Sequence, residues 1–416
     1  MQRDEPLYYF DERHCSAKYN RLNPHSRSSA DTLKIMEKHF SSIGLTRLID
    51  LTGQDRIGMP VFNAVKPGMV NYSVQHGKGL TKEDARLSAV MESFERFYGS
   101  FADLPSYAAT CDEAGRRHVI PPFERLAKAR AGIFHRNLTI DWTIGFDITA
   151  NAPVGVPLDL VLLRPSASAV RLPLLQASSN GLAAAAHFAE AVCQGLLELF
   201  ERDAITCDHY RSRAKEMLMP LDLIRWRSIE HPVIRPLLDT LRAADIIPLL
   251  FSCAVDTGIP TCSCYIANKQ DPNEGFFHGM GAGMDQATAM IRAITEAVQA
   301  RSVLRAGTRD VHFHADALFH KLSMPAEMIE QLGGEDAGRE FTGFVDLSTD
   351  TFEDDIRVCM ERLARIGLDQ VIVVRLTPED IDFVVVRVIV PGLEGYMLPL
   401  YTPGKRALEM LENKNA

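Results

Sequence analysis

The stretch SSNGLAAAAHFAEAVCQGLLELFERDA, at residues 178–204, carries the strongest structural signal in the chain. It opens with small, turn-prone residues up to Gly181 and then contains no helix breaker. Because Ala, Leu, Glu and Gln dominate the residues after Gly181, the pattern predicts one long helix that begins directly there. Apolar side chains lie on more than one face of this helix, which indicates packing on several sides: Phe188, Val192, Leu196, Leu197, Leu199 and Phe200.

One face of the predicted helix is polar. At about 100° per residue, an arc of roughly 80° contains Glu190, Gln194, Glu198 and Glu201. Such a face is most often solvated, but solvated faces usually mix Lys with Glu at i,i+4 spacing, and this one has no Lys. Because carboxylates packed together repel one another, the pattern indicates a positive partner. Oxygen ligands without Cys or His nearby favour Mg²⁺.

Composition narrows the class of protein. The chain has 416 residues, 46% of them hydrophobic, which is enough for a large core. The net charge of −9 argues against a nucleic-acid binder. The eight cysteines show no CxxC spacing, so we expect the protein to lie in a reducing cytoplasm. Cys262 and Cys264 are expected to pack on one face of a strand rather than to bind a metal. No signal-peptide core or window of about 18 apolar residues is present, so neither export nor a membrane span is expected.

The rest of the chain mixes both kinds of element without a flexible linker, which predicts an α+β fold. Helices are predicted at residues 28–44 with Ser28 or Ser29 as cap, 81–98 with Thr81 as cap, 232–244, 285–304, 351–366 and 404–413. Strands are predicted at residues 46–51, 60–65, 70–75, 138–146, 154–163, 247–255, 260–267, 370–376 and 383–390.

Two glycine-containing segments are predicted to be loops. Residues 76–79 place Lys78 between glycines ahead of a helix, but position 72 is Tyr and position 79 is Gly, so the phosphate-loop motif fails. A flexible loop with one cation before a helix still suits an anion. The second segment, GMGAG at residues 279–283, is predicted to be a turn and lacks the context of a dinucleotide fingerprint.

Two more helices repeat the polar stripe. Ser88, Glu92 and Glu95 recur at i, i+4 and i+7 on the second predicted helix and are followed by Arg96. On the helix after the glycine run, the same spacing joins Arg292, Glu296 and Gln299. Three striped helices far apart in sequence are most simply explained if they converge on one site.

Three segments resemble the ATP-binding motifs of the YcaO superfamily in the same order: SAVMESFER at 88–96, SNGLAAAAHFAEAVCQGLLELFERDA at 179–204 and GAGMDQATAMIRAITEAVQAR at 281–301. The GKG at 77–79 fits the same family. DLTGQDRIGMPV at 50–61 and RVIVPGLE at 387–394 further resemble stand-alone members that work with a TfuA-type partner. The resemblance implies a YcaO-type α+β fold, with mixed sheets and long helices around an ATP site. It divides the chain into an N-terminal segment, 1–73, and a YcaO domain, 74–416.

The resemblance also assigns residues. It implies binding of ATP and Mg²⁺, with Glu92, Glu95, Glu190 and Glu201 as metal ligands. It also implies that the catalytic residues are Glu190, Glu201 and Arg202. The nucleotide site implied by the resemblance is completed by Arg27, Lys78, Ser88, Arg96, Ser179, Asn180, Gln194, Glu198, Arg292, Glu296 and Gln299. Arg27 enters as the nearest candidate for a basic residue that the family places ahead of the first motif.

The implied chemistry acts on a peptide or protein backbone. A nucleophile adds to an amide carbonyl, and ATP phosphorylates the oxyanion so that oxygen leaves as phosphate. Azoline-forming members commonly end in a Pro-x-Pro-x-Pro tail, whereas this chain ends TPGKRALEMLENKNA, which favours thioamide formation with sulfide and a TfuA-like partner. The alternatives are an azoline-forming cyclodehydratase, a non-catalytic ATP-binding scaffold and another ATP-dependent ligase or kinase. The oligomeric state is left open, a homodimer included.

Overall fold

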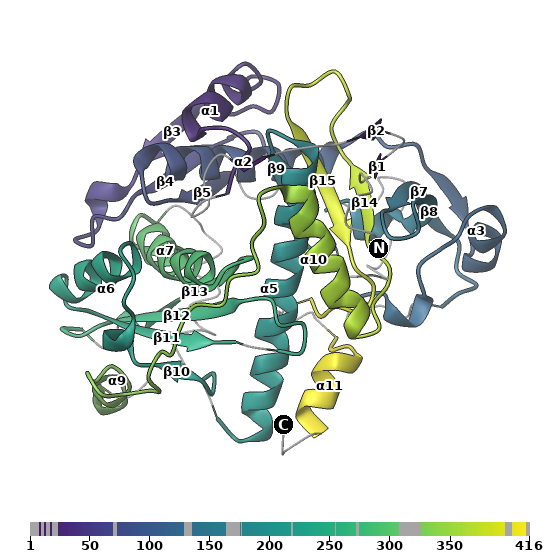
Figure 1. Ribbon diagram of the computed structural model, residues 1–416. Coiled ribbons are helices and arrows are strands. Elements are labelled where there is room, and N and C mark those ends of the chain that lie inside the picture. Colours follow the sequence, from purple (N-terminus) through teal and green to yellow (C-terminus); the bar gives the residue numbers. More distant parts are fainter. Residues whose placement is uncertain are drawn as a thin grey trace.

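A computed structural model describes residues 8–9, 12–13, 17–18, 24–69, 73–128, 135–163, 175, 177–217, 219–253, 255–271, 274–307, 326–395 and 402–412. The fold is α+β, as predicted, with antiparallel sheets arranged around one long helix, α5 (Phe188–Ala214). Figure 1 shows α5 in teal, running between two of these sheets.

The largest sheet has six strands: β6 (Tyr107–Ala109), β7 (Ile140–Asp147), β8 (Ala152–Pro157), β14 (Ile372–Arg375), β15 (Val384–Ile389) and β9 (Leu182–Ala185). Different helices cover the two faces of this sheet. Because side chains alternate along each strand, neighbouring residues of β15 belong to different cores. Val384, Val386 and Val388 share a core with α5 and α10 (Phe352–Arg365). Val385, on the opposite face, shares a core with α2 (Lys82–Phe101).

Two further sheets, of three and four strands, each carry a long helix on one face. The three-stranded sheet contains β3 (Arg47–Asp50), β4 (Val61–Val65) and β5 (Val74–Lys78), and α2 packs on it. The four-stranded sheet contains β10 (Leu223–Ile224), β11 (Ile246–Ser252), β12 (Thr261–Asn268) and β13 (Phe276–Ala282), and both α6 (Ile234–Ala243) and α7 (Gln286–Arg305) pack on it. The predicted boundary at 73/74 falls between β4 and β5, which are paired in one sheet.

Both glycine-containing segments predicted as loops are strands instead. Residues 76–78 belong to β5, and residues 279–282 belong to β13. A Cβ atom at Gly77 would lie 2.1 Å from the Ala85 carbonyl oxygen in α2, and one at Gly279 would lie 2.2 Å from the Ala293 carbonyl oxygen in α7. The glycines therefore allow strand and helix backbones to touch, a role that local sequence does not distinguish from a turn.

The prediction of one helix directly after Gly181 is also wrong. Leu182–Ala185 forms strand β9, paired with β15 from Leu182↔Arg387 to Ala185↔Val384, and α5 begins only at Phe188. Alanine favours a helix locally, but the hydrogen bonds and packing offered by a distant strand outweigh that preference. The predicted packing of α5 on several sides is confirmed, since all six of its named apolar residues are buried.

Most other elements agree with the predictions within a few residues, with two exceptions. The helix predicted at 28–44 ends at Glu37, and the second part of the strand predicted at 154–163 is a short helix, because β8 ends at Pro157. Ser28 caps α1 (Ser29–Glu37), and Thr81 caps α2. Cys262 and Cys264 are buried in the apolar core beneath α6 and α7. The described elements that remain are β1 (Tyr8–Tyr9), β2 (Glu12–Arg13), α3 (Cys111–Arg117), α4 (Leu158–Val161), α9 (Ala326–Leu332) and α11 (Lys405–Glu412). Within the described residues, no helix has the length and apolarity needed to cross a membrane.

Candidate functional site

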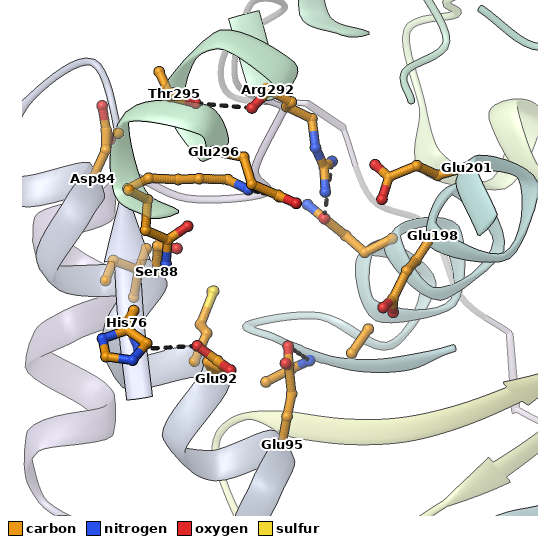
Figure 2. Close-up of a pocket in the computed structure, with 18 of the residues that line it drawn as sticks. His76, Asp84, Ser88, Glu92, Glu95, Glu198, Glu201, Arg292, Thr295 and Glu296 are labelled. Carbon is orange, nitrogen blue, oxygen red and sulfur yellow. Dashed lines mark hydrogen bonds and ion pairs between the residues drawn. The ribbon is translucent and has the colours of Figure 1, made fainter. Parts of the chain in front are cut away.

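A cavity of about 500 Å³ lies where α2, α5 and α7 meet the edge strand β9. Figure 2 shows labelled side chains from the three helices pointing into this space. The predicted site residues that line it are Lys78, Ser88, Glu92, Glu95, Arg96, Ser179, Gln194, Glu198, Glu201, Arg202, Arg292, Glu296 and Gln299. Helical periodicity thus identified three polar faces that the fold brings together.

Three predicted residues do not line the cavity: Arg27, Asn180 and Glu190. Glu190 is 1% exposed, and its carboxylate accepts hydrogen bonds from the Ser26 backbone N–H (3.1 Å) and hydroxyl (2.6 Å). His25 Nδ1 lies 2.7 Å from the other Glu190 oxygen. Glu190 therefore holds the N-terminal segment on α5, and His25, rather than Arg27, is placed at the cavity wall.

The carboxylates on α2 are fixed by backbone amides of other elements. The His76 N–H in β5 donates to Glu92 Oε2 at 3.0 Å, and Arg96 Nη2 lies 3.4 Å from Glu92 Oε1. The Ala184 N–H donates to Glu95 Oε1 at 2.9 Å. Because Ala184 lies in the edge strand β9, Glu95 connects α2 to the six-stranded sheet.

The carboxylates on α5 are fixed in the same way. The Gly181 N–H donates to Glu198 Oε2 at 3.1 Å, and the Ala282 N–H in β13 donates to Glu201 Oε2 at 3.0 Å. Arg202 Nη2 lies 3.7 Å from Glu198 Oε1 and 3.3 Å from Glu201 Oε1. Each carboxylate thus keeps a defined direction toward the cavity.

Cations from several elements balance these acids. Lys78 in β5 forms an ion pair with Glu296 in α7, and Arg292 Nη1 lies 3.5 Å from Gln194 Oε1. The stripe on α5 has no Lys of its own, but the cavity also contains Arg96 and Arg202. Arginine and lysine side chains therefore supply part of the positive charge expected from the sequence. Which elements provide these cations becomes apparent only in the tertiary structure.

The acids differ in their tendency to ionise. Burial, helped by neighbouring Glu198 and Glu92, raises the pKa of Glu95 to about 8 despite the Ala184 N–H. Burial also raises the pKa of Glu198. For Glu296 burial acts in the same direction, but Lys78 and Arg202 outweigh it and its pKa lies below the ordinary value. Burial between α2 and α5 thus disfavours the charged forms of Glu95 and Glu198, whereas cations favour the charged form of Glu296.

The donor set fits Mg²⁺ bound together with a nucleotide. Within the described ranges, no group of three or more His, Cys, Asp or Glu side chains forms a metal site by itself. Mg²⁺ commonly takes only one or two protein carboxylates and completes its shell with phosphate oxygens and water. Carboxylates facing arginines and a lysine across one cavity provide for both the metal and the phosphates.

Besides His25, sequence reasoning missed two more histidines that line the cavity, His76 and His278. His278 Nε2 lies 2.6 Å from Ser263 Oγ, and its ring stacks on Tyr265 at 4.2 Å between centroids. Burial lowers the pKa of His278 to about 4, so its imidazole is neutral near pH 7. Each histidine precedes a glycine that packs on a helix, and that shared His-Gly pattern is the signal that could have identified them.

Comparison with known proteins agrees with this geometry. Residues 76–394 match a protein-family model described as YcaO cyclodehydratase, ATP- and Mg²⁺-binding. An uncharacterized protein of Methanothermobacter thermautotrophicus is 29% identical over 405 residues, which cover 92% of this chain and 99% of that protein. A Rhizobium leguminosarum bv. trifolii protein, described as uncharacterized and in the tfuA 3′ region, is 31% identical over 396 residues, with 92% of each chain covered.

Solved structures share the fold. A heterocyclase in complex with substrate and cofactor superposes with a TM-score of 0.75 at 20% identity over 98% of this chain, which spans 57% of the heterocyclase. YcaO from Methanopyrus kandleri, bound with AMPPCP and Mg²⁺, gives a TM-score of 0.67 at 22% identity and covers 93% of this chain and 98% of that one. The predicted YcaO-type fold is confirmed.

Proposed function

This chain belongs to the YcaO family of ATP- and Mg²⁺-binding enzymes, and we propose that it phosphorylates a backbone amide of a peptide so that sulfide replaces the amide oxygen. The observation that supports this most directly is the cavity, where carboxylates of α2, α5 and α7 face Lys78, Arg96, Arg202 and Arg292. An amide oxygen is a poor leaving group, and bound ATP supplies the phosphoryl group that allows it to depart as phosphate.

In this proposal the side chains of the cavity bind either Mg²⁺ or the nucleotide. Glu92, Glu95 and Glu201 would hold Mg²⁺, whereas Glu190 is bonded to His25 and Ser26 and lies outside the cavity. Arg202, Arg292 and Lys78 bind phosphate oxygens, which favours the charge that develops during phosphoryl transfer. Ser179, Ser88 and Gln299 complete the nucleotide contacts. Glu201 and Arg202, adjacent on α5, would act on the reacting phosphoryl group.

The choice of a thioamide product rests on one observation. The Rhizobium relative is described by its place beside tfuA, which supports a TfuA-like partner that delivers sulfur. Two of the solved relatives are heterocyclases, which favours azoline formation instead and keeps cyclodehydration as the second candidate.

The products can be separated by mass. The purified protein is incubated with a candidate peptide, the TfuA-like partner, ATP, Mg²⁺ and sulfide, and the peptide is examined by mass spectrometry. A thioamide exchanges oxygen for sulfur, whereas an azoline loses one water and requires a Cys, Ser or Thr after the modified carbonyl. Replacement of every Cys, Ser and Thr in the substrate is expected to leave the modification in place. Loss of a dehydrated product on replacement would assign the enzyme to cyclodehydration.

A further inference from the structure

Arg387 is the charged residue in the otherwise apolar strand VVVRVI of β15, and it is 1% exposed. Its Nε donates to the Val161 carbonyl at 3.0 Å, and its Nη1 donates to the Asn180 carbonyl at 2.7 Å. Its Nη2 is buried and has no hydrogen-bond acceptor within the described part of the chain. Because burying a guanidinium is costly, this arrangement calls for a role beyond packing.

The Asn180 carbonyl belongs to a short loop that connects Arg387 to the cavity. Gly181 follows at φ 76°, and a Cβ atom there would lie 2.2 Å from the Val388 carbonyl oxygen. The Val388 N–H donates to the Gly181 carbonyl at 2.8 Å, and the Gly181 N–H donates to Glu198 Oε2 at 3.1 Å. The loop is thus held between β15 on one side and the Glu198 carboxylate on the other.

The same loop delivers a second group to the cavity. Ser179 lines the cavity wall, and its carbonyl accepts the Leu182 N–H at 2.9 Å, which closes the turn into β9. One arginine therefore fixes a turn that carries both a hydroxyl and the amide that directs Glu198. The Arg387 guanidinium and the Glu198 carboxylate also attract each other electrostatically.

We propose that Arg387 is a positioning residue that fixes the turn at residues 179–181, so that Glu198 and Ser179 are aimed at the bound Mg²⁺–nucleotide. Arg387 itself is not among the residues that line the cavity and acts through Glu198. The inference rests on the nucleotide site of the proposed function but not on the identity of the peptide product.

A double-mutant cycle tests this coupling. Calorimetry measures the affinity for Mg²⁺ with a non-hydrolysable ATP analogue in wild type, Arg387→Met, Glu198→Gln and the double variant. We expect Arg387→Met to weaken binding about tenfold or more in the wild-type background and less than about threefold in the Glu198→Gln background. Arg387→Lys, which keeps the charge but cannot reach both carbonyls, should lie between wild type and Arg387→Met.

A further measurement and a control variant keep the test independent of enzymatic activity and of general unfolding. Amide hydrogen exchange of the segment 178–185 should be faster in ligand-free Arg387→Met and Arg387→Lys. Arg375→Met is the matched control, because Arg375 lies on the adjacent strand β14 and donates to the Pro378 carbonyl at the protein surface. This control should leave both affinity and exchange unchanged.

The outcomes separate the two proposals. Equal weakening by Arg387→Met in both backgrounds would reduce Arg387 to a structural residue and overturn the inference. If Arg387→Met does not fold, Arg387→Lys carries the test, and wild-type affinity with unchanged exchange would overturn the inference as well. Failure of the wild-type protein to bind the nucleotide would instead overturn the proposed function itself.

Discussion

Residues of one type take different tasks around the cavity because their partners differ. Glu201 is 4% exposed and is held by the Ala282 N–H, whereas Glu296 is paired with Lys78. Glu190, from the same stripe as Glu201, is directed toward the N-terminal segment. Periodicity predicted which side chains share a helix face, since 3.6 residues per turn fixes that geometry. It could not predict Glu190's partners or the burial of Arg387, because both depend on contacts with distant parts of the chain.

Replacement of Glu201 by Gln tests its charge at nearly constant volume. The remaining amide oxygen can still accept the Ala282 N–H, so we expect the fold to be retained. Removal of a negative charge facing Mg²⁺ should lower ATP-dependent turnover by about a hundredfold or more. Steady-state kinetics with circular dichroism measures both effects. Glu361→Gln, an exposed change on α10, is the control, and activity of Glu201→Gln within twofold of that control would contradict the assignment.

The raised pKa of Glu95 predicts a pH-dependent stability. Its folded pKa of about 8 exceeds the ordinary value of 4.5, so the folded state holds an extra proton between these values. The free energy of unfolding of ligand-free wild type, relative to Glu95→Gln, should therefore fall as pH rises through this window, by at most about 1.4 kcal/mol per pH unit.

Urea unfolding of both proteins at several pH values measures that difference. Because Glu95→Gln cannot ionise, it removes the contribution of this one carboxyl and leaves those of the other groups in place. A difference that stays constant or grows with pH would show that Glu95 is ionised in the folded protein.

Strand–helix units are the elements that build the site. In the three-stranded and four-stranded sheets, the last strand leads through a cap, Thr81 or Asp285, into a long helix that packs back on it. The caps and helices were predictable because their signals are local. The strands β9 and β13 and the second part of β5 were not, because glycine and alanine runs resemble turns or helices until a partner backbone is known. The close approach of these backbones brings the polar faces of α2 and α7 to the cavity.

Gly279→Ala tests this close approach. The new Cβ atom would lie 2.2 Å from the Ala293 carbonyl oxygen and the Ala297 nitrogen, so α7 must move away from β13. We expect a loss of about 3 kcal/mol in the free energy of unfolding, together with weaker nucleotide binding, because Arg292 and Glu296 move with the helix. Gly53→Ala meets no atom within 4 Å and should change stability by less than about 1 kcal/mol. Equal stability of the two variants would show that α7 does not need this contact.

At the scale of the whole molecule, the cavity depends on all three larger sheets at once. The helix α2 belongs to the three-stranded sheet and α7 to the four-stranded sheet, while β9 and α5 belong to the six-stranded sheet and its core. Sequence stripes predicted that the helices converge, and the YcaO resemblance predicted the architecture. The order of strands, and the use of β9 as an edge between α2 and α5, came only from the structure, since antiparallel pairing across hundreds of residues leaves no local signal.

A ligand that bridges these elements should stabilise the whole fold, and only with the metal. Because the complete cavity exists in the folded chain alone, a nucleotide at about 100 times its Kd should add about 2.7 kcal/mol to the free energy of unfolding. Without Mg²⁺, the phosphates would face the carboxylates Glu92 and Glu201 directly, so that repulsion should remove most of the gain. Thermal denaturation with a non-hydrolysable ATP analogue, in Mg²⁺ and in excess chelator, measures both cases. AMP, which lacks the two outer phosphates, should give a smaller shift in Mg²⁺, and an equal shift for the ATP analogue in chelator would remove the metal from this site.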